Sequence, residues 1–252
     1  MKGGINLNGY KNEYEIINYL NGKNKNEVHI IFQEMLENLF PNIKDNDIIF
    51  ANKYGKYAKC DMVLEVNGVR KGVSIKCGSR NSVHVEKVNN FIYFVNKCGF
   101  SNYNELLKYL YSDGSNNNTG INRISASEYK LNHIKEINSI NYSLNGTNIL
   151  DKLLYRFLIC ADINYKVKVD AFLCGTVNDF VWCSKDEAIS FLLDNNTFES
   201  SGVHASKLFI QLWNKNIIRN PKYEWCREYI QVKWYSIFDD IIYIMCNRNN
   251  KY

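Results

Sequence analysis

The sequence predicts a mixed fold of helices and strands, of the α/β or α+β class. Two features carry this prediction. Apolar residues recur at helical spacing near the N-terminus, and short runs rich in β-branched and aromatic residues, separated by Gly or Asn-Gly, follow them. At 252 residues the chain is long enough to bury a sizeable core, and its composition, 46% hydrophobic and 23% charged, is that of a globular protein.

The N-terminal half is expected to hold two helices, a three-stranded meander and two more helices. The first helix has Ile16, Ile17 and Leu20 at helical spacing, and the second ends at Pro41. The expected helices are 11–21, 26–40, 85–99 and 104–112, and the expected strands are 47–54, 59–66 and 71–77.

A polar segment at residues 112–120 is the predicted boundary between a nuclease-like core, residues 1–112, and a C-terminal mixed α/β half, residues 121–252, which pack as two domains or as one. After it, Ser125 and Glu128 form a capping-box pattern that opens a helix to about Ile140. Further expected elements are a helix at 150–163, strands at 166–174, 206–213, 227–235 and 239–246, and a short helix at 185–193.

Bulk properties restrict the class of protein. The N-terminus lacks the apolar run of a signal peptide and no stretch is apolar enough to span a membrane, so we expect a cytoplasmic protein. The eight cysteines show no metal-binding spacing, which favours reduced, buried thiols. A net charge of +5 suits a polyanionic partner without identifying one.

The most informative stretch is a predicted hairpin at residues 61–76. Asn67-Gly68 between two β-branched runs is typical of a type I′ turn, whose two central residues need positive φ. With this turn, Val66 pairs with Val69, and counting outward places Asp61 opposite Ser74. Lys76 is then a diagonal neighbour of Asp61, roughly 7 Å away between β-carbons.

An acid and a lysine at this place in a sheet have two interpretations. The acid can hold a divalent cation that polarises a phosphate and lowers the pKa of a bound water, while the lysine offsets charge developing on the phosphoryl oxygens. Alternatively, the pair is an ordinary ion pair on a solvated hairpin face and contributes little stability. The spacing alone favours the second interpretation.

Asp61 followed across a hairpin by Ser74-Ile75-Lys76 resembles the core of the PD-(D/E)xK, or restriction-endonuclease-like, nuclease superfamily. The resemblance covers roughly residues 11 to 100 and implies a central mixed sheet flanked by helices. It also implies a magnesium-dependent phosphodiesterase acting on DNA, with Mn²⁺ as a substitute for Mg²⁺. Asp61 would be a metal ligand, the Ile75 carbonyl a second metal contact and Lys76 the catalytic lysine.

Ser74 departs from this family pattern, which has Asp or Glu there, and a hydroxyl is a poor ligand for Mg²⁺. Two glutamates are candidates to replace the missing acid as a catalytic residue and metal ligand. Glu13 shares the inward helical face of the first helix, from which the family often supplies a glutamate. Glu86 projects on the same side as His84 if residues 82–86 are extended. As alternatives, Glu13 is a partly buried ion-pair partner and Glu86 favours the N-terminus of the next helix.

Two further matches to the (D/E)xK pattern exist. The literal one, Glu128-Tyr129-Lys130, is expected in the first turns of a helix, where the glutamate has a structural reason to be. The variant Gln231-Val232-Lys233 is strand-like but has no Asp-bearing hairpin before it. It remains a minor rival site.

Several polar residues are candidates for contacting nucleic acid. Ser79, Arg80 and Asn81 follow the proposed catalytic strand directly, and with His84 they are placed to touch a substrate backbone; the alternatives are a polar turn and a structural histidine. Residues 213–235 interleave cations with aromatics, a pattern suited to phosphates and bases, unless the tryptophans are core. The candidates in this second stretch are Arg219, Lys222, Arg227 and Lys233.

The favoured function is a magnesium-dependent endonuclease on double-stranded DNA, of a type II restriction or phage-defence system. Cutting two opposed strands needs two such sites, so a homodimer is expected. Two alternatives remain open: a degenerate nuclease fold that binds nucleic acid without cutting it, which Ser74 supports, and an interaction protein whose hairpin is merely a solvated edge.

Overall fold

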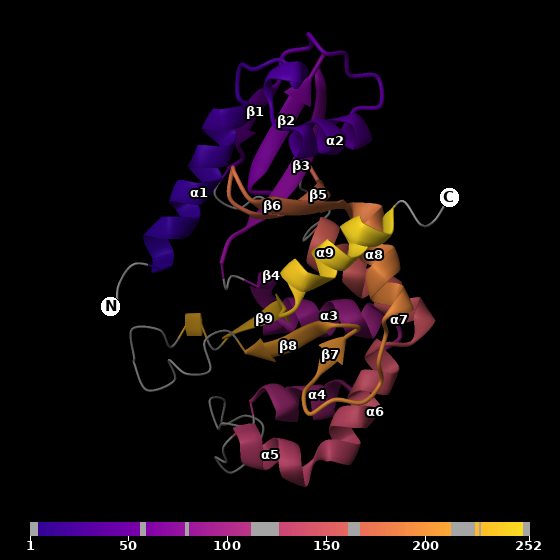
Figure 1. The fold of residues 1–252 in the computed structure, drawn as a ribbon. Coiled ribbons are helices and arrows are strands. Elements are labelled where there is room, and N and C mark those ends of the chain that lie inside the picture. The colour runs from indigo at the N-terminus through magenta and orange to yellow at the C-terminus, as the bar shows by residue number, and fades with distance from the viewer. Residues whose placement is uncertain are drawn as a thin grey trace. The chain divides into compact units, whose positions relative to one another are not determined.

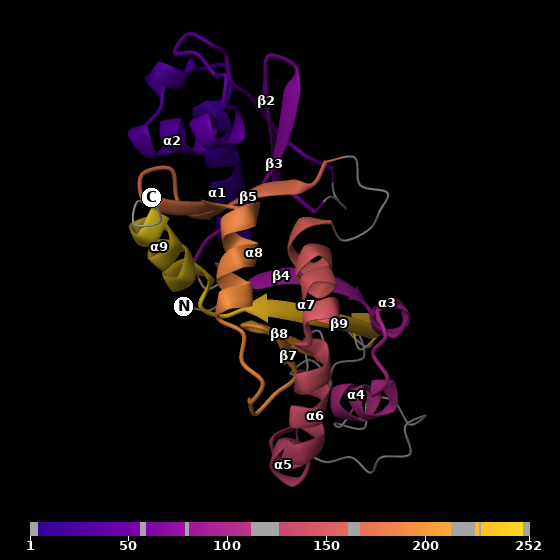
Figure 2. The same ribbon diagram turned by 90° about the vertical axis from the view of Figure 1, so that its right-hand side faces the viewer.

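The computed structural model describes residues 5–55, 59–78, 81–111, 126–160, 167–212, 225–226 and 228–248. The chain forms two compact units, each with its own sheet (Figures 1 and 2). Unit 1 comprises Met1–Asn81, Leu158–Phe191 and Ser236–Tyr252, and unit 2 comprises Ser82–Phe157 and Leu192–Tyr235. The units therefore interleave along the chain, whereas the sequence predicted the consecutive halves 1–112 and 121–252.

Unit 1 is built on a five-stranded mixed sheet of order β1-β2-β3-β5-β6. The first three strands form the predicted antiparallel meander, β5 lies parallel to β3, and β6 returns antiparallel to β5. Its elements are α1 (Ile5–Leu20), η1 (Lys25–Glu27), α2 (Ile30–Leu39), β1 (Phe50–Lys53), β2 (Met62–Val66), β3 (Val69–Lys76), β5 (Val169–Gly175), β6 (Phe180–Ser184), α8 (Lys185–Asp194) and α9 (Ile237–Asn247). This mixed sheet with flanking helices confirms the predicted fold class.

One hydrophobic core joins the helices to the sheet in unit 1. Ile16 and Leu20 of α1 and Phe32 of α2 are fully buried in it. The sheet contributes Met62, Leu64, Val73 and Ile75 of the hairpin together with Ala171, Leu173 and Trp182. Because side chains alternate along a strand, burying this set leaves Ser74 and Lys76 on the opposite face of β3.

The parallel pairing of β3 with β5 contains an irregularity at Gly72. The register shifts between Gly72 and Val73, and the Gly72 N–H donates to Oδ2 of Asp170 at 3.1 Å. A β-carbon at Gly72 would lie 2.1 Å from the backbone oxygen of Lys168, so only glycine fits this close approach. The bulge sets which β5 residues stand beside the Ser74-Ile75-Lys76 segment.

Unit 2 is built on an antiparallel four-stranded sheet of order β4-β9-β8-β7, visible in Figure 1. In β9, Ile230, Val232 and Trp234 are buried while the residues between them are partly exposed, which is the alternation of a one-sided sheet. Its elements are β4 (Ser82–Lys87), α3 (Val88–Lys97), α4 (Tyr103–Leu110), α5 (Ala126–Asn132), α6 (Ile134–Leu144), α7 (Thr147–Leu154), β7 (His204–Ala205), β8 (Leu208–Leu212) and β9 (Tyr229–Trp234). A π-helical turn, η3 (Tyr155–Ile159), continues α7.

The sequence prediction of a strand at 239–246 is wrong, because these residues belong to helix α9. Ile237, Ile241 and Ile244 are its buried face at spacings of four and three, and the Ser236 hydroxyl donates to Asp240 at 2.6 Å in its first turn. An isoleucine-rich run reads equally well as a strand or as a buried helix.

Three other expectations need smaller corrections. The helix predicted over 85–99 begins only at Val88, since 82–87 form β4. The helix expected to reach Ile140 is interrupted at His133, and the strand β6 was not predicted. The polar segment predicted as the boundary, 112–120, and the capping Ser125 lie outside the described residues. Among the residues described, no helix has the length and apolarity to span a membrane.

Candidate active site

The hairpin of β2 and β3 has the predicted turn and register. Asn67 and Gly68 adopt φ of 49° and 77°, as a type I′ turn requires. Val66 pairs with Val69, and the ladder continues to Met62 opposite Val73. Because this register follows from a two-residue turn, the positions of Asp61 and Ser74 near each other are set by local sequence.

Asp61 stands just outside the regular ladder. Its N–H donates to the carbonyl of Val73 at 2.9 Å, and its carboxylate turns toward β3, where Oδ2 accepts the Ile75 N–H at 2.7 Å and the Ser74 hydroxyl at 3.1 Å. Val73 and Ile75 are two apart, so their N–H and C=O groups project toward the same side of β3. The Asp61 carboxylate thus takes the N–H of Ile75 at the point where β2 ends.

Lys76 completes the group. Its Nζ lies 3.5 Å from Asp61 Oδ2 and 3.3 Å from the carbonyl oxygen of Ile75. The side chains of Lys76 and Asp61 are 16% and 29% exposed, so the pair is partly buried but still accessible to solvent. A carboxylate, a backbone carbonyl and an ammonium therefore lie together at one end of the hairpin. The roles assigned to Asp61, Ile75 and Lys76 stay predictions.

Two oxygen donors at this end of the hairpin are available to a metal ion. In the part of the chain the structure describes, Asp61 Oδ1 accepts no hydrogen bond, and the Ile75 carbonyl faces the same side as that carboxylate. Both are hard oxygen donors. Ser74 is 5% exposed, and its hydroxyl donates to Asp61. Among the described residues, no group of three or more His, Cys, Asp or Glu side chains could enclose a metal. Two protein oxygens fit Mg²⁺, which keeps most of its ligands as water, but not an all-protein cage.

Glu13, a candidate for the second acid, lies on α1 with its side chain 14% exposed. Its Oε2 is 3.0 Å from Nζ of Lys53, whose partner across β1 and β2 is Met62, the neighbour of Asp61. The same ammonium lies over the Tyr10 and Tyr14 rings, 4.4 and 4.8 Å from their centroids. Glu13 on α1 is thus the ion-pair partner of Lys53 on β1, as the alternative interpretation expected, and its role toward a metal stays a prediction.

Asp170, an acid in the strand next to the site, was not singled out from the sequence. Its side chain is 14% exposed and its Oδ1 lies 3.2 Å from Lys185 and 3.8 Å from Lys71. Burial, and then the charges of Asp61 and Asp170, raise the pKa of the Cys60 thiol to about 12, so this cysteine stays protonated beside the site. The sequence signal for it was one acid within the expected strand at residues 166–174.

Glu86, the other candidate acid, belongs to unit 2 and is buried with its own partners. Arg156 donates to both of its oxygens, from Nε at 2.9 Å and from Nη2, and His84 Nε2 lies 3.0 Å from Oε1. Burial alone would raise the pKa of Glu86, but the hydrogen bonds from Arg156 and His84 lower it below its ordinary value. In this geometry Glu86 serves an ion pair inside unit 2, and a metal-binding role for it stays a prediction.

Replacing Arg156 with methionine is expected to cost about 3 kcal/mol of unfolding free energy at pH 7, because it leaves the buried Glu86 carboxylate without its guanidinium partner and with His84 as its remaining described partner. Since the folded-state pKa of Glu86 lies below its unfolded value, the stabilisation is complete above that unfolded value and is lost as pH falls through the folded one. Urea unfolding from pH 7 down to pH 3 measures it. The E86Q/R156M variant, without either charge, should lose less; equal urea midpoints for wild type and R156M at pH 7 would contradict the prediction.

The predicted nucleic-acid contacts are only partly described. Ser79, Arg80, Arg219, Lys222 and Arg227 lie outside the described residues. Asn81 is half-buried, and Lys233 is a half-buried residue of β9 with its ammonium 5.6 Å from the Tyr235 ring centroid. His84 is 5% exposed and packs against the Phe157 ring, so it is not on the surface in this structure.

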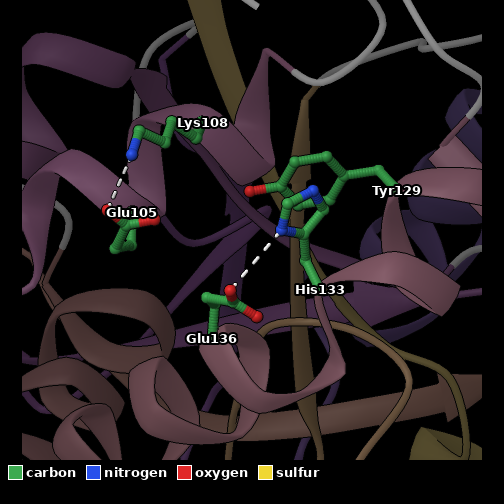
Figure 3. A pocket seen from close by; sticks show the side chains of 5 residues that line it. All are labelled: Glu105, Lys108, Tyr129, His133 and Glu136. Carbon is green, nitrogen blue, oxygen red and sulfur yellow. Dashed lines mark hydrogen bonds and ion pairs between the residues drawn. The ribbon is translucent and has the colours of Figure 1, made fainter.

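The two other motif matches lie in unit 2. Gln231-Val232-Lys233 lies in β9 as expected, and Glu128-Tyr129-Lys130 lies in helix α5, also as expected. Tyr129 helps to line a pocket of about 480 Å³ between α4, α5 and α6 (Figure 3). The charges there are already paired, Lys108 with Glu105 at 2.8 Å and His133 with Glu136 at 3.6 Å. None of the pocket's lining residues was a predicted site residue.

The sequence matches no protein-family model and no curated protein. Among solved structures, the fold is similar to that of restriction endonuclease MspI, crystallised in complex with its cognate DNA. The TM-score is 0.50 over 89% of this chain and 87% of that chain, at 14% sequence identity. The protein therefore has a restriction-endonuclease-like fold, and at this identity the likeness extends to the fold alone.

Proposed function

We propose that the protein is a magnesium-dependent endonuclease that hydrolyses phosphodiester bonds of double-stranded DNA, in a type II restriction or phage-defence system. The observation that carries the proposal is the convergence of the Asp61 carboxylate, the Ile75 carbonyl and the Lys76 ammonium within 3.5 Å contacts at the end of the hairpin. The fold, similar to that of an endonuclease crystallised with DNA, supports it by analogy.

In the proposed mechanism Asp61 and Ile75 would hold Mg²⁺, or Mn²⁺ in its place, with a carboxylate and a carbonyl oxygen. An ion held there would polarise the phosphate and lower the pKa of an attacking water. Lys76 donates hydrogen bonds to that water and offsets charge on the phosphoryl oxygens. The hydrogen bonds from Ile75 and Ser74 fix Oδ2, which leaves Oδ1 as the oxygen of Asp61 for the metal.

Glu13 is the acid of unit 1 that we propose as the further metal ligand in place of the carboxylate missing at Ser74. To act there its carboxylate must exchange Lys53 for the metal. Glu86 is the second choice, since it would have to leave Arg156. A homodimer would supply two sites for the two strands of a duplex.

One observation favours a second candidate, a nuclease fold that binds DNA without cutting it. Ser74 occupies the place of an acid, and the described residues hold no three-acid cluster. Such a protein would keep Lys76 and the surrounding cations for phosphate contacts while lacking the charge needed to hold Mg²⁺.

Cleavage of mixed plasmid and phage DNA by the purified protein separates these functions. Discrete fragments that appear with Mg²⁺ or Mn²⁺ and disappear with EDTA are the result expected for an endonuclease. DNA of every methylation state that is bound tightly but left intact identifies the non-cutting module. A protein that neither cuts nor binds DNA in a salt-sensitive way is neither of the two.

A further inference from the structure

One face of the unit 2 sheet, here called the outer face, is partly exposed over β4, β8 and β9, whereas at β7 the partner of Phe209, His204, is buried. It consists of the residues that alternate with the buried ones in β4, β8 and β9. Directly paired residues share a face, and the register pairs Gln211 with Gln231, Gln231 with Val85, and Lys233 with Phe209. The members of the outer face are Val85, Lys87, Phe209, Gln211, Tyr229, Gln231 and Lys233, all at least partly exposed.

Two glutamines stand side by side at the centre of this face. The chain has only three glutamines, and Gln211 and Gln231 are direct cross-strand partners. The third, Gln33, donates to the Val28 carbonyl at 2.8 Å. Over the described residues, by contrast, neither side-chain amide of Gln211 or Gln231 makes a hydrogen bond. Each therefore presents a donor and an acceptor that no group in the described part of the chain occupies.

The charge of the outer face suits a polyanion. Lys87 and Lys233 lie on it, on opposite sides of the glutamines along β9. Lys87 pairs with Tyr229, two residues before Gln231, and Lys233 lies two residues after Gln231. The only acid in β4, β8 and β9 is Glu86, which lies on the opposite, buried face in its pair with Arg156. At one end the Tyr229 ring meets the exposed Trp225 edge-on, with centroids 5.9 Å apart. A sheet face with amides at its centre and cations beside them matches the grooves of duplex DNA, where base edges lie between two phosphate backbones.

We propose that Gln211 and Gln231 read base identity in the major groove of double-stranded DNA, with adenine as the base each selects. In a bidentate pair with adenine, a glutamine NH₂ group donates to N7 while the glutamine carbonyl oxygen accepts from the N6 amino group. Both amide groups must therefore be available at once, and no group in the described part of the chain occupies either. The major groove admits a two-stranded antiparallel ribbon, and β8 and β9, which carry the two glutamines, are antiparallel neighbours. The inference rests on the proposed function, because it assigns the recognition surface of the same enzyme.

The spacing of the pair fits neighbouring base pairs. Directly opposite β-carbons are roughly 4.5–5.5 Å apart, and base pairs stack about 3.4 Å apart. Since a glutamine side chain has three rotatable bonds, two amides from adjacent strands can reach successive base steps. Lys87 and Lys233, flanking them, would contact phosphates and carry no base preference.

The test is selection of bound duplexes from a randomised DNA library, with Ca²⁺ in place of Mg²⁺ and all proteins carrying K76A to prevent cutting. The parent is compared with Q211L, Q231L, Q211E and Q231E. Each leucine variant should lose its preference for adenine at one position of the selected site, by roughly 5- to 150-fold. Each glutamate variant should turn the preference at that position toward cytosine, whose N4 amino group only donates.

Lys87→Met is the matched control on the same face. It should weaken binding to all sequences alike and reduce the salt dependence by about one phosphate contact, with the selected site unchanged. Thermal unfolding checks that each variant is folded, and Q231N, which keeps the amide but shortens the reach, should behave like Q231L.

The outcomes are distinguishable. A parent that selects a defined site which both leucine variants keep would overturn the inference and leave the proposed function standing. Variants that change the oligomeric state but not the selected site would make the outer face an interface between copies, which also overturns it. A parent that binds no duplex would overturn the inference and the proposed function together.

Discussion

Replacing Lys76 with methionine is expected to slow DNA cleavage by about 10²–10³-fold, the usual loss when one group that stabilises transition-state charge is removed. Methionine keeps much of the side-chain volume but has no ammonium group to offset charge on the phosphoryl oxygens or to donate to the attacking water. Single-turnover cleavage of a plasmid with saturating Mg²⁺ measures the effect, because it reports the chemical step without product release.

Lys71→Met is the matched control for this variant. Lys71 lies on the same strand, but its ammonium faces Asp170 at 3.8 Å rather than Asp61. Asp170 keeps Lys185 at 3.2 Å when Lys71 is replaced, so cleavage by K71M should stay within about threefold of wild type. If K76M cut DNA as fast as K71M, Lys76 would be only a member of a solvated ion pair.

The hairpin could be predicted from the sequence because everything that defines it is local. Asn67 and Gly68 fix the turn type, the turn fixes the register, and the register brings Asp61 to Ser74 and Lys76. Pairing residues outward from the turn did not predict the last hydrogen bond, in which the Asp61 N–H donates to the Val73 carbonyl. With the backbone of Asp61 held in this way, its carboxylate accepts from the Ile75 N–H. That detail depends on where β2 stops.

The rest of the site depends on contacts between residues far apart in the chain. Asp170 reaches Gly72 across 98 positions, and Arg156 reaches Glu86 across 70. Neither partner can be recognised in the sequence, because a parallel crossover, or an ion pair between a helix and a strand, produces no hydrophobic periodicity. Glu86 illustrates this well, because its two carboxylate oxygens look available until Arg156 is placed.

Secondary structure was least predictable where both periods describe the same residues. The run from 239 to 246 is rich in isoleucine and other apolar residues, as a buried strand is, and it also repeats isoleucine at helical spacing. The helix prevails because Ile237, Ile241 and Ile244 can then all be buried on one face. By contrast, β9 alternates cleanly through Ile230, Val232 and Trp234, and it was predicted as a strand.

Replacing Asp61 with asparagine is expected to have the largest effect of all, about 10³-fold or more in the rate of cleavage, because it removes the one charged oxygen ligand that the hairpin offers to Mg²⁺. The amide is nearly isosteric and its oxygen can still accept from the Ile75 N–H, so the hairpin should keep its shape. Affinity for Mn²⁺, measured by electron paramagnetic resonance of the free ion, should fall in parallel with cleavage.

Binding to DNA should respond in the opposite direction, and this separates a metal ligand from a structural aspartate. With EDTA present, the D61N variant should bind duplex DNA at least as tightly as wild type, since one negative charge near the phosphates is gone. Ser74→Ala is the matched control: it removes the hydroxyl that donates to the same carboxylate at 3.1 Å but keeps the charge. A single hydrogen bond is worth about 1 kcal/mol, so S74A should retain cleavage within roughly tenfold. Equal losses in S74A and D61N would mean that Asp61 acts by holding β3 in place rather than by holding a metal ion.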